Sequence, residues 1–135
     1  MNLVSVRLIT ADVARLVSFY ERLTGLVADR PSPDFAELRT VGGTIAIGSV
    51  RTVDLLVPGA ARPADNRSAI VELLVDDVDA VFAALPGGSV EVVAPPTTMP
   101  WGNRSLLVRD PDGTLVNLFT PVTAESVARF AGTAR

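Results

Sequence analysis

The chain has 135 residues, of which 48% are hydrophobic and 20% are charged, and its net charge at neutral pH is −3. This length suits one domain with its own core, and no apolar run approaches the roughly 20 residues of a membrane-spanning helix. The sequence contains no Cys, His or Lys, which excludes thiolate nucleophiles, histidine catalysis and Schiff bases through lysine. Its Arg residues are scattered singly, so no nucleic-acid partner is expected.

The first half of the sequence predicts one helix among strands. Alternating apolar residues indicate a strand over residues 3–9, whose apolar face should pack against the helix. The helix is expected over residues 12–24, with Asp12 in its first turn and Gly25 as its C-cap. Its apolar stripe contains Tyr20, which favours a core position for this phenol over a catalytic one. Three further strands are expected at residues 35–41, 44–49 and 52–57.

The second half repeats this order after a linker over residues 59–67. A strand is expected over residues 69–75, a helix from Asp77 to Leu85, and a strand over residues 90–93. The acidic residues at the start of this helix are explained by capping and by the helix dipole, and not by a cation site.

A hairpin and a short helix complete the second half. The turn Asp110-Pro111-Asp112-Gly113 joins strands over residues 104–109 and 114–119, because Pro111 presets φ and Gly113 tolerates a positive φ. A short helix is expected over residues 123–131.

The two halves therefore share the order βαβββ, which indicates an internal duplication. Asp12-Val13 matches Asp77-Val78, and residues 53–58 align with residues 116–121. The expected fold is α+β, in a single domain over residues 1–135. Its first module spans residues 1–58, its second spans residues 68–121, and a helical tail spans residues 122–135.

Three motifs give the sequence a family resemblance over residues 3–121. They are the helix ending in Leu23-Thr24-Gly25-Leu26, the loop Pro100-Trp101-Gly102-Asn103-Arg104, and the turn at residues 110–113 with the apolar strand that follows. The sequence resembles the glyoxalase/bleomycin resistance/extradiol dioxygenase (vicinal oxygen chelate) superfamily. The resemblance implies two modules whose mixed sheet curls around a cavity, and a homodimer. Because the family hosts isomerases, dioxygenases, thiol transferases and antibiotic-binding proteins, it does not settle the function.

The resemblance also implies four metal-ligand positions, on the first and last strand of each module. In this sequence they are Ser5, Asp54, Ile70 and Asn117. Only Asp54 would bind a divalent ion well, whereas Fe, Ni, Mn and Zn require several nitrogen, sulfur or carboxylate ligands together. The sequence therefore predicts no bound metal and no other cofactor, and the metal-dependent catalysis of the family is not expected.

Strand alternation predicts a cavity lined by polar and apolar side chains together. The expected ligand-binding residues are Ser5, Arg7, Asp54, Ile70, Glu72, Trp101, Arg104, Asn117 and Phe119, with Leu56, Leu74 and Leu115 adding apolar surface. Such a mixture suits a flat small molecule with a few polar edges.

Several of these residues have a second interpretation. Arg7 and Glu72 occupy equivalent places in the repeat and either hold a ligand or pair with each other, and the ion pair is favoured. Trp101 is either a stacking surface at the cavity mouth or a loop anchor. For Arg104, pinning the loop by hydrogen bonds is favoured over ligand contact. The C-terminal tail covers the cavity mouth or a partner subunit, or docks without a role.

Two main functional classes follow. The favoured class is a metal-free protein, resembling the antibiotic-binding members, that binds a small amphipathic or aromatic molecule without converting it. The alternative is a glyoxalase-like isomerase or lyase without the usual metal, in which Asp54, Glu72 and Arg7 act as acid, base and electrostatic clamp. A degenerate domain that regulates another protein is a third class. The N-terminus lacks a signal-peptide pattern, so a cytoplasmic protein without a membrane partner is expected.

Overall fold

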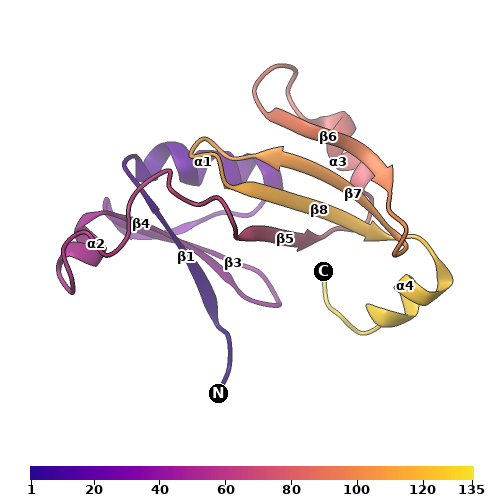
Figure 1. Cartoon of the computed structure of the whole chain (residues 1–135), viewed down its shortest axis with the longest axis horizontal. Coiled ribbons are helices and arrows are strands. Elements are labelled where there is room, and N and C mark those ends of the chain that lie inside the picture. Colours follow the sequence, from indigo (N-terminus) through magenta and orange to yellow (C-terminus); the bar gives the residue numbers. More distant parts are fainter. The chain divides into compact units, whose positions relative to one another are not determined.

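The computed structural model describes residues 1–135, which divide into two compact units. The first unit contains residues 1–66 and 111–113, and the second contains residues 67–110 and 114–135. Each unit has the order strand, helix, strand, strand, strand, which confirms the predicted α+β class and the βαβββ repeat (Figure 1). No helix in either unit combines the length and apolar character that crossing a membrane requires.

Four strands build the sheet of the first unit. They are β1 (Ser5–Thr10), β2 (Asp29–Ser32), β3 (Phe35–Arg39) and β4 (Thr44–Ser49), in the spatial order β1-β4-β3-β2. Strand β1 runs parallel to β4, and the other neighbours are antiparallel. The sheet is therefore mixed and has β1 and β2 at its open edges.

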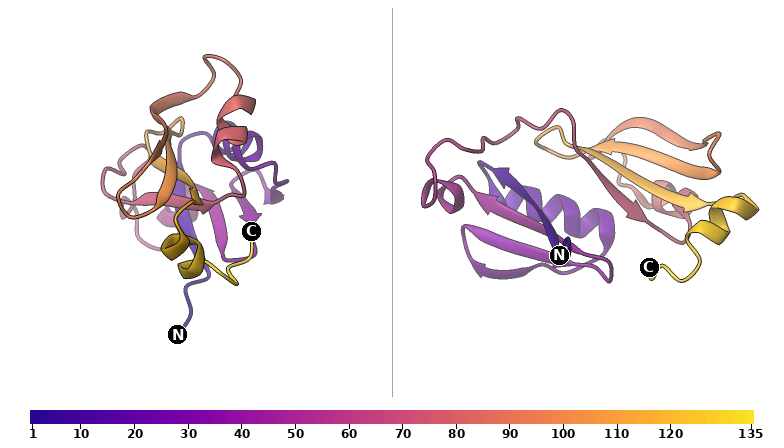
Figure 2. Two further views of the ribbon diagram at one scale, coloured as in Figure 1. Left: turned by 90° about the vertical axis from the view of Figure 1, so that its right-hand side faces the viewer. Right: turned by 60° about the horizontal axis from the view of Figure 1, so that its bottom comes forward.

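Helix α1 (Val13–Thr24) packs across this sheet, mainly on β3 and β4 (Figure 2). The sequence predicted packing on the first strand, but β1 lies at the edge and the helix covers the central strands. Its buried residues are Leu16, Val17, Phe19, Tyr20 and Leu23, so the core position of Tyr20 is confirmed. Burying one such large apolar side chain stabilises the fold by about 1.5–3 kcal/mol.

The ends of α1 are set by local chemistry, as predicted. The carboxylate of Asp12 accepts a hydrogen bond from the Arg15 backbone N–H at 3.0 Å. At the other end Gly25 has φ of 73°, and its N–H donates to the Glu21 carbonyl at 2.8 Å. A positive φ is accessible to glycine without a steric penalty, which stops the helix at this point.

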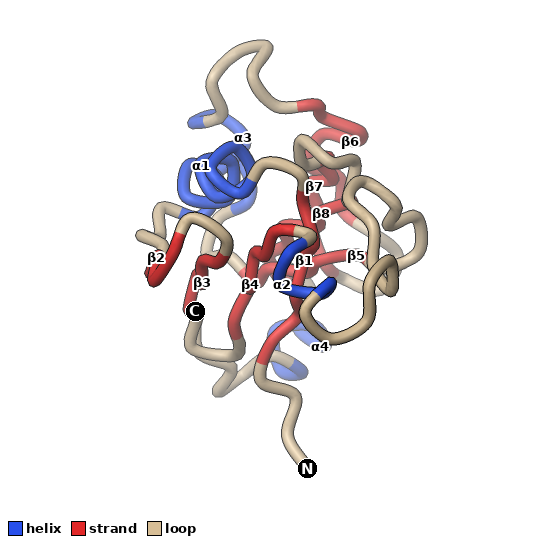
Figure 3. Tube along the Cα trace, turned by 90° about the vertical axis from the view of Figure 1, so that its left-hand side faces the viewer, coloured by secondary structure: helices blue, strands red, loops and turns tan.

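The predicted strand over residues 52–57 is wrong, because this segment begins with the one-turn helix α2 (Arg51–Asp54), directly after β4 (Figure 3). The Thr52 hydroxyl donates to the Ser49 carbonyl at 2.8 Å, which turns the chain away from the sheet. The fourth strand of the first unit is instead β2, an exposed edge strand without apolar alternation. Its Pro31 is tolerated at an edge, where one backbone donor is not needed for pairing.

The second unit repeats the arrangement of the first. Its strands are β5 (Ile70–Leu74), β6 (Glu91–Thr98), β7 (Asn103–Arg109) and β8 (Leu115–Pro121), in the order β5-β8-β7-β6 with β5 parallel to β8. Helix α3 (Val78–Ala84) packs on β6, β7 and β8, and helix α4 (Ala124–Arg129) follows β8. Strand β6 is longer than predicted, because this edge strand tolerates Pro95 and Pro96 and is irregular in register between Ala94 and Thr97.

Local signals place the elements of the second unit as expected. The Asp77 carboxylate accepts from the Ala80 backbone N–H at 3.0 Å, which confirms capping as its role. In the hairpin turn Gly113 has φ of 86°, and the Thr114 N–H donates to the Asp110 carboxylate at 3.0 Å. The predicted hairpin is therefore confirmed.

Candidate functional site

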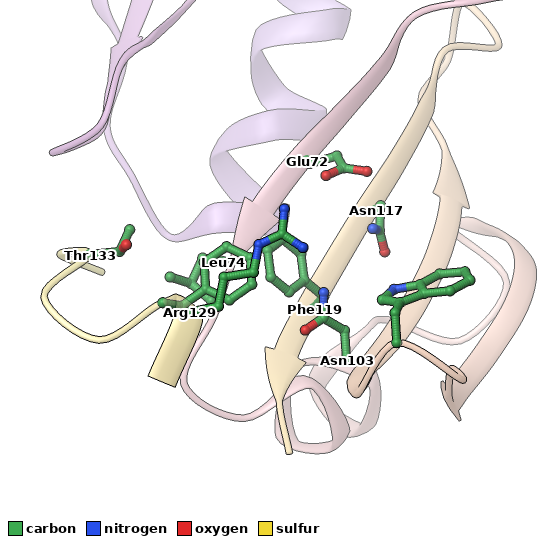
Figure 4. A pocket seen from close by; sticks show the side chains of 9 residues that line it. Glu72, Leu74, Asn103, Asn117, Phe119, Arg129 and Thr133 are labelled. Carbon is green, nitrogen blue, oxygen red and sulfur yellow. The ribbon is translucent and has the colours of Figure 1, made fainter. Parts of the chain in front are cut away.

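The second unit contains a pocket of about 450 Å³ (Figure 4). Its lining residues are Glu72, Leu74, Trp101, Asn103, Asn117, Phe119, Arg129, Phe130 and Thr133. They come from β5, β8, the loop before β7, the first residue of β7, and the C-terminal tail.

Strand pairing brings the floor of the pocket together. Glu72 on β5 lies directly opposite Asn117 on β8, and Leu74 lies opposite Phe119. Because side chains alternate between the faces of a sheet, these four residues share one face. Figure 4 shows the side chains of Glu72 and Asn117 on this face of the two neighbouring strands. Asn103 on β7 belongs to the same face, whereas its neighbour Arg104 points to the face covered by α3.

The loop before β7 is shaped to receive the start of α4. Gly102 has φ of +91°, and a Cβ at this position would lie 2.0 Å from the Thr123 hydroxyl oxygen. The Gly102 carbonyl accepts hydrogen bonds from the backbone N–H groups of Val122 at 2.9 Å and Thr123 at 3.2 Å. Glycine is therefore required here by both conformation and space, and Trp101 is held next to the beginning of the tail.

The C-terminal tail forms one wall of the pocket. Thr123 caps α4 by accepting from the Ser126 N–H at 3.3 Å, and the Ser126 hydroxyl donates to the Asn103 side-chain oxygen. The rings of Phe119 and Phe130 lie 5.2 Å apart between centroids. Three tail residues, Arg129, Phe130 and Thr133, line the pocket of their own unit. The expected place of the tail at the cavity mouth or on a partner subunit stays a prediction.

The polar groups of the pocket have few partners of their own. The exposed carboxylate of Glu72 forms no hydrogen bond or ion pair within the second unit. The Asn117 Oδ1 atom is buried and also lacks a hydrogen-bond donor. The Arg129 guanidinium lies 5.4 Å from the centroid of the Phe130 ring, and Trp101 is 63% exposed. A buried acceptor without a donor is costly, so this surface is suited to a ligand that donates hydrogen bonds.

Four of the predicted ligand-binding residues line this pocket together: Glu72, Trp101, Asn117 and Phe119. Arg104 is not among the lining residues. Its Nε and one terminal nitrogen donate to the two carboxylate oxygens of Asp79 on α3, at 2.6 and 2.8 Å. The hydrogen bond from Arg104 lowers the pKa of the Asp79 carboxyl, and the same bond raises the pKa of Arg104. Arg104 thus pins β7 to α3, whereas its expected contacts with the loop or with a ligand stay predictions.

The remaining predicted residues have other surroundings. Ser5 and Arg7 lie on β1 of the first unit, where the Arg7 guanidinium is 5.6 Å from the centroid of the Phe35 ring. Ile70 shares the face of Glu72 on β5 but is 47% exposed and does not line the pocket. The proposed pairing of Arg7 with Glu72 stays a prediction.

The expected place of Asp54 in a closing strand is wrong. Asp54 ends α2, and its carboxylate accepts from the Gly59 N–H at 3.1 Å, which closes a turn. Leu56, which was expected to face the cavity, is 80% exposed after this helix. The misplacement follows from reading residues 52–57 as a strand.

This correction changes the metal-ligand position on the last strand of the first module. The closing strand of the first unit is β4, where Ala46 pairs with Arg7 as Asn117 pairs with Glu72 in the second unit. The four places are therefore Ser5, Ala46, Ile70 and Asn117, and none of these is a carboxylate, a thiolate or an imidazole. No group of three or more acidic residues is arranged to hold a metal. This donor set does not fit a divalent transition metal.

Sequence reasoning missed four lining residues: Asn103, Arg129, Phe130 and Thr133. Asn103 stands within the Trp101-Gly102-Asn103 motif, and its alternation with Arg104 would have indicated its face. The tail residues have only a weak sequence signal, because a short helix does not indicate which surface it packs against.

Each of the two βαβββ units is an open mixed sheet with a helix across one face. The chain is therefore a protein built from two repeated βαβββ modules. Residues 2–118 match the family described as the Glyoxalase/Bleomycin resistance protein/Dioxygenase superfamily, and the chain belongs to this family. The resemblance inferred from the sequence motifs is thereby confirmed.

Solved structures support the same fold. The chain is similar to a glyoxalase/bleomycin resistance protein/dioxygenase from Nocardioides, with 22% identity, a TM-score of 0.75, and coverage of 92% of this chain and 85% of that one. A family enzyme from Burkholderia phytofirmans PsJN gives 18% identity, a TM-score of 0.77, and coverage of 90% and 100%. TioX from Micromonospora sp. ML1 gives 26% identity and a TM-score of 0.68, with coverage of 90% of this chain and 100% of that one. The search of curated proteins gave no match.

Proposed function

We propose that the second unit binds a small amphipathic or aromatic molecule and releases it unchanged, without a metal ion. The observation that carries this proposal is the composition of the pocket. Aromatic and aliphatic side chains surround a carboxylate and an amide that have no partners within the unit. Small-molecule sites combine apolar surface with a few polar groups that fix the orientation of the ligand, and this lining contains both.

Catalysis has less support from the same pocket. Acid-base catalysis of the alternative kind requires two titratable groups at the reacting atoms, and Glu72 is the only carboxylate in the lining. The second carboxylate expected for that role, Asp54, instead closes a turn after α2. Binding without conversion is therefore favoured. Because the family description includes bleomycin resistance proteins, planar antibiotics are one class of candidate ligand.

The proposal can be tested with the intact chain and a panel of planar antibiotics and aromatic acids and amines. Trp101 is the only tryptophan, so its fluorescence reports binding near the pocket, and mass spectrometry of each compound reports conversion. Stacking on an aromatic face adds about 0.5–1.5 kcal/mol, so Trp101→Ala should weaken binding roughly threefold to tenfold or more, as measured by calorimetry.

Phe82→Ala supplies the matched control, because Phe82 is a partly exposed ring on α3 outside the pocket lining. It should leave the affinity unchanged. A compound that is converted during incubation would favour the enzyme reading. A tight binder whose affinity is the same in Trp101→Ala and Phe82→Ala would show that the binding site lies elsewhere.

A further inference from the structure

The pocket floor presents two hydrogen-bond acceptors side by side. Glu72 and Asn117 are paired residues on the adjacent strands β5 and β8, on the same face. Within the second unit, the Glu72 carboxylate has no donor, and Asn117 Oδ1 is buried without one. Neighbouring strands lie about 5 Å apart, which one small group with several N–H bonds can span.

The Glu72 carboxylate favours a donor that is positively charged, whereas the Asn117 oxygen accepts from any donor. The Glu72 carboxylate accepts hydrogen bonds only, and bonds from a cationic N–H group to a carboxylate are about twice as strong as those between neutral groups. The aromatic residues of the pocket add to this preference. Trp101 and Phe119 contribute rings to the same lining, and the face of an aromatic ring attracts a cation through its quadrupole.

We propose that the natural ligand carries a cationic N–H donor head, such as an amidinium, guanidinium or primary ammonium group, on a flat apolar body. The head is held by Glu72 and Asn117, and the body lies against Trp101 and Phe119. This inference rests on the proposed binding function and adds the chemical class of the ligand.

Arg129 is the one cationic residue in the lining. It allows a pocket that selects cations to be distinguished from one that selects anions. It reaches over the pocket face from α4, with its guanidinium 5.4 Å from the Phe130 ring centroid (Figure 4). If the pocket selected anions, Arg129 would be the group that holds them. Since a cationic head would be repelled by this side chain, replacing Arg129 separates the two cases.

The experiment uses three probes of nearly equal shape: benzamidine, benzamide and benzoate. Their affinities for the intact chain are measured by calorimetry, because they differ in charge and in hydrogen-bond donors but share one ring. We expect benzamidinium to bind about tenfold more tightly than benzamide, and benzoate to bind most weakly.

Three variants then test the named residues. Glu72→Gln keeps the shape of an exposed side chain and should weaken the binding of benzamidinium about tenfold. The affinity for benzamide should change less than about threefold. Asn117→Ala should weaken benzamidinium and benzamide, and a circular dichroism melt checks that this variant is folded. Arg129→Gln should tighten benzamidinium about twofold, as expected for removal of a like charge at an exposed site.

Different outcomes distinguish a failure of this inference from a failure of the proposed binding function. If benzoate binds best and Arg129→Gln abolishes its binding, the pocket selects anions, so the inference is overturned while small-molecule binding stands. The inference is also overturned, while small-molecule binding stands, if Glu72→Gln leaves the affinity for benzamidinium unchanged and Trp101→Ala lowers it. If no probe and no compound of the wider panel binds below roughly 10 mM, both proposals fail.

Discussion

The ring of Phe119 on β8 lies 5.2 Å from the ring of Phe130 at the end of α4, with an interplanar angle of 58°. This contact joins the floor of the pocket to its C-terminal wall. Together with the Ser126–Asn103 hydrogen bond, it makes the last residues of the chain a part of the second unit. The tail thereby determines which side chains a ligand would meet.

Phe130→Ala should loosen this wall. Tilted aromatic pairs contribute about 0.5–1.5 kcal/mol beyond buried area, so the variant should lose at least this much stability in chemical denaturation. It should also bind benzamidine more weakly than the wild type does. Phe82→Ala, on α3 outside the pocket lining, is the control for binding and should leave the affinity for benzamidine unchanged. Equal affinities of the two variants would show that the tail is not a wall of the site.

Gly102→Ala should be among the more damaging small substitutions. The new methyl group would lie 2.0 Å from the Thr123 hydroxyl, at a φ of +91°. Strained backbone of this kind costs roughly 1–3 kcal/mol, and the displaced start of α4 should add to the loss. Gly87→Ala, where a Cβ would meet no atom within 4 Å, is the control. Urea denaturation should show a clearly lower midpoint for Gly102→Ala alone.

The ion pair of Arg104 and Asp79 should make stability depend on pH in the acidic range. Hydrogen bonding to Arg104 lowers the pKa of Asp79 below its ordinary value of 3.8. A carboxyl with a depressed folded-state pKa contributes stability above its unfolded pKa and loses this contribution as pH falls through the folded value. Asp79→Asn should therefore be less stable than the wild type at pH 7.

The difference between Asp79→Asn and the wild type should shrink once pH falls below about 3.8. Thermal unfolding at a series of pH values measures it. Arg104→Gln should reproduce the same pH profile, because it removes the donor of the same pair. A difference that stays constant from pH 7 to the acid limit would contradict the assignment.

The purified protein should carry no stoichiometric transition metal. The positions that would supply ligands hold Ser5, Ala46, Ile70 and Asn117, which offer no nitrogen, sulfur or carboxylate set. Elemental analysis after gel filtration, without chelators in any buffer, is the measurement. About one Fe, Ni, Mn or Zn per chain would refute the expectation.

The protein should be a homodimer in solution. The expectation comes from the architecture implied by the family resemblance, and the exposed apolar residues of the edge region around β1 are consistent with it. Leu3, Val4 and Val6 are 80%, 65% and 49% exposed, and exposed apolar edges often mark interfaces. Light scattering at micromolar concentration should give twice the chain mass of 14.2 kDa. A mass of one chain would rule the dimer out.

Features set by short stretches of chain could be predicted from the sequence. The ends of α1 follow from the Asp12 carboxylate and the αL conformation of Gly25, and the start of α3 follows from Asp77. The hairpin turn follows from Pro111 and Gly113. In each case the decisive interaction lies within a few residues, so composition and spacing contain the information.

Strand membership was decided by pairing partners that local patterns do not reveal. Residues 29–32 have no apolar alternation, yet they pair with β3 as β2, whereas the apolar residues 52–57 leave the sheet through α2. An edge strand needs hydrogen-bond partners more than a buried face, so its signal is weak in the sequence.

The lining of the pocket could likewise be predicted only in part from the sequence. Alternation predicted that Glu72, Asn117 and Phe119 would share a face, and the loop motif singled out Trp101. Only the tertiary structure turned Arg104 to Asp79 on α3 and brought Phe130 onto Phe119. The reason is physical: a side chain's face is fixed by its own strand, but the wall opposite it comes from a segment whose docking depends on contacts such as those of Gly102 and Asn103 with the start of α4.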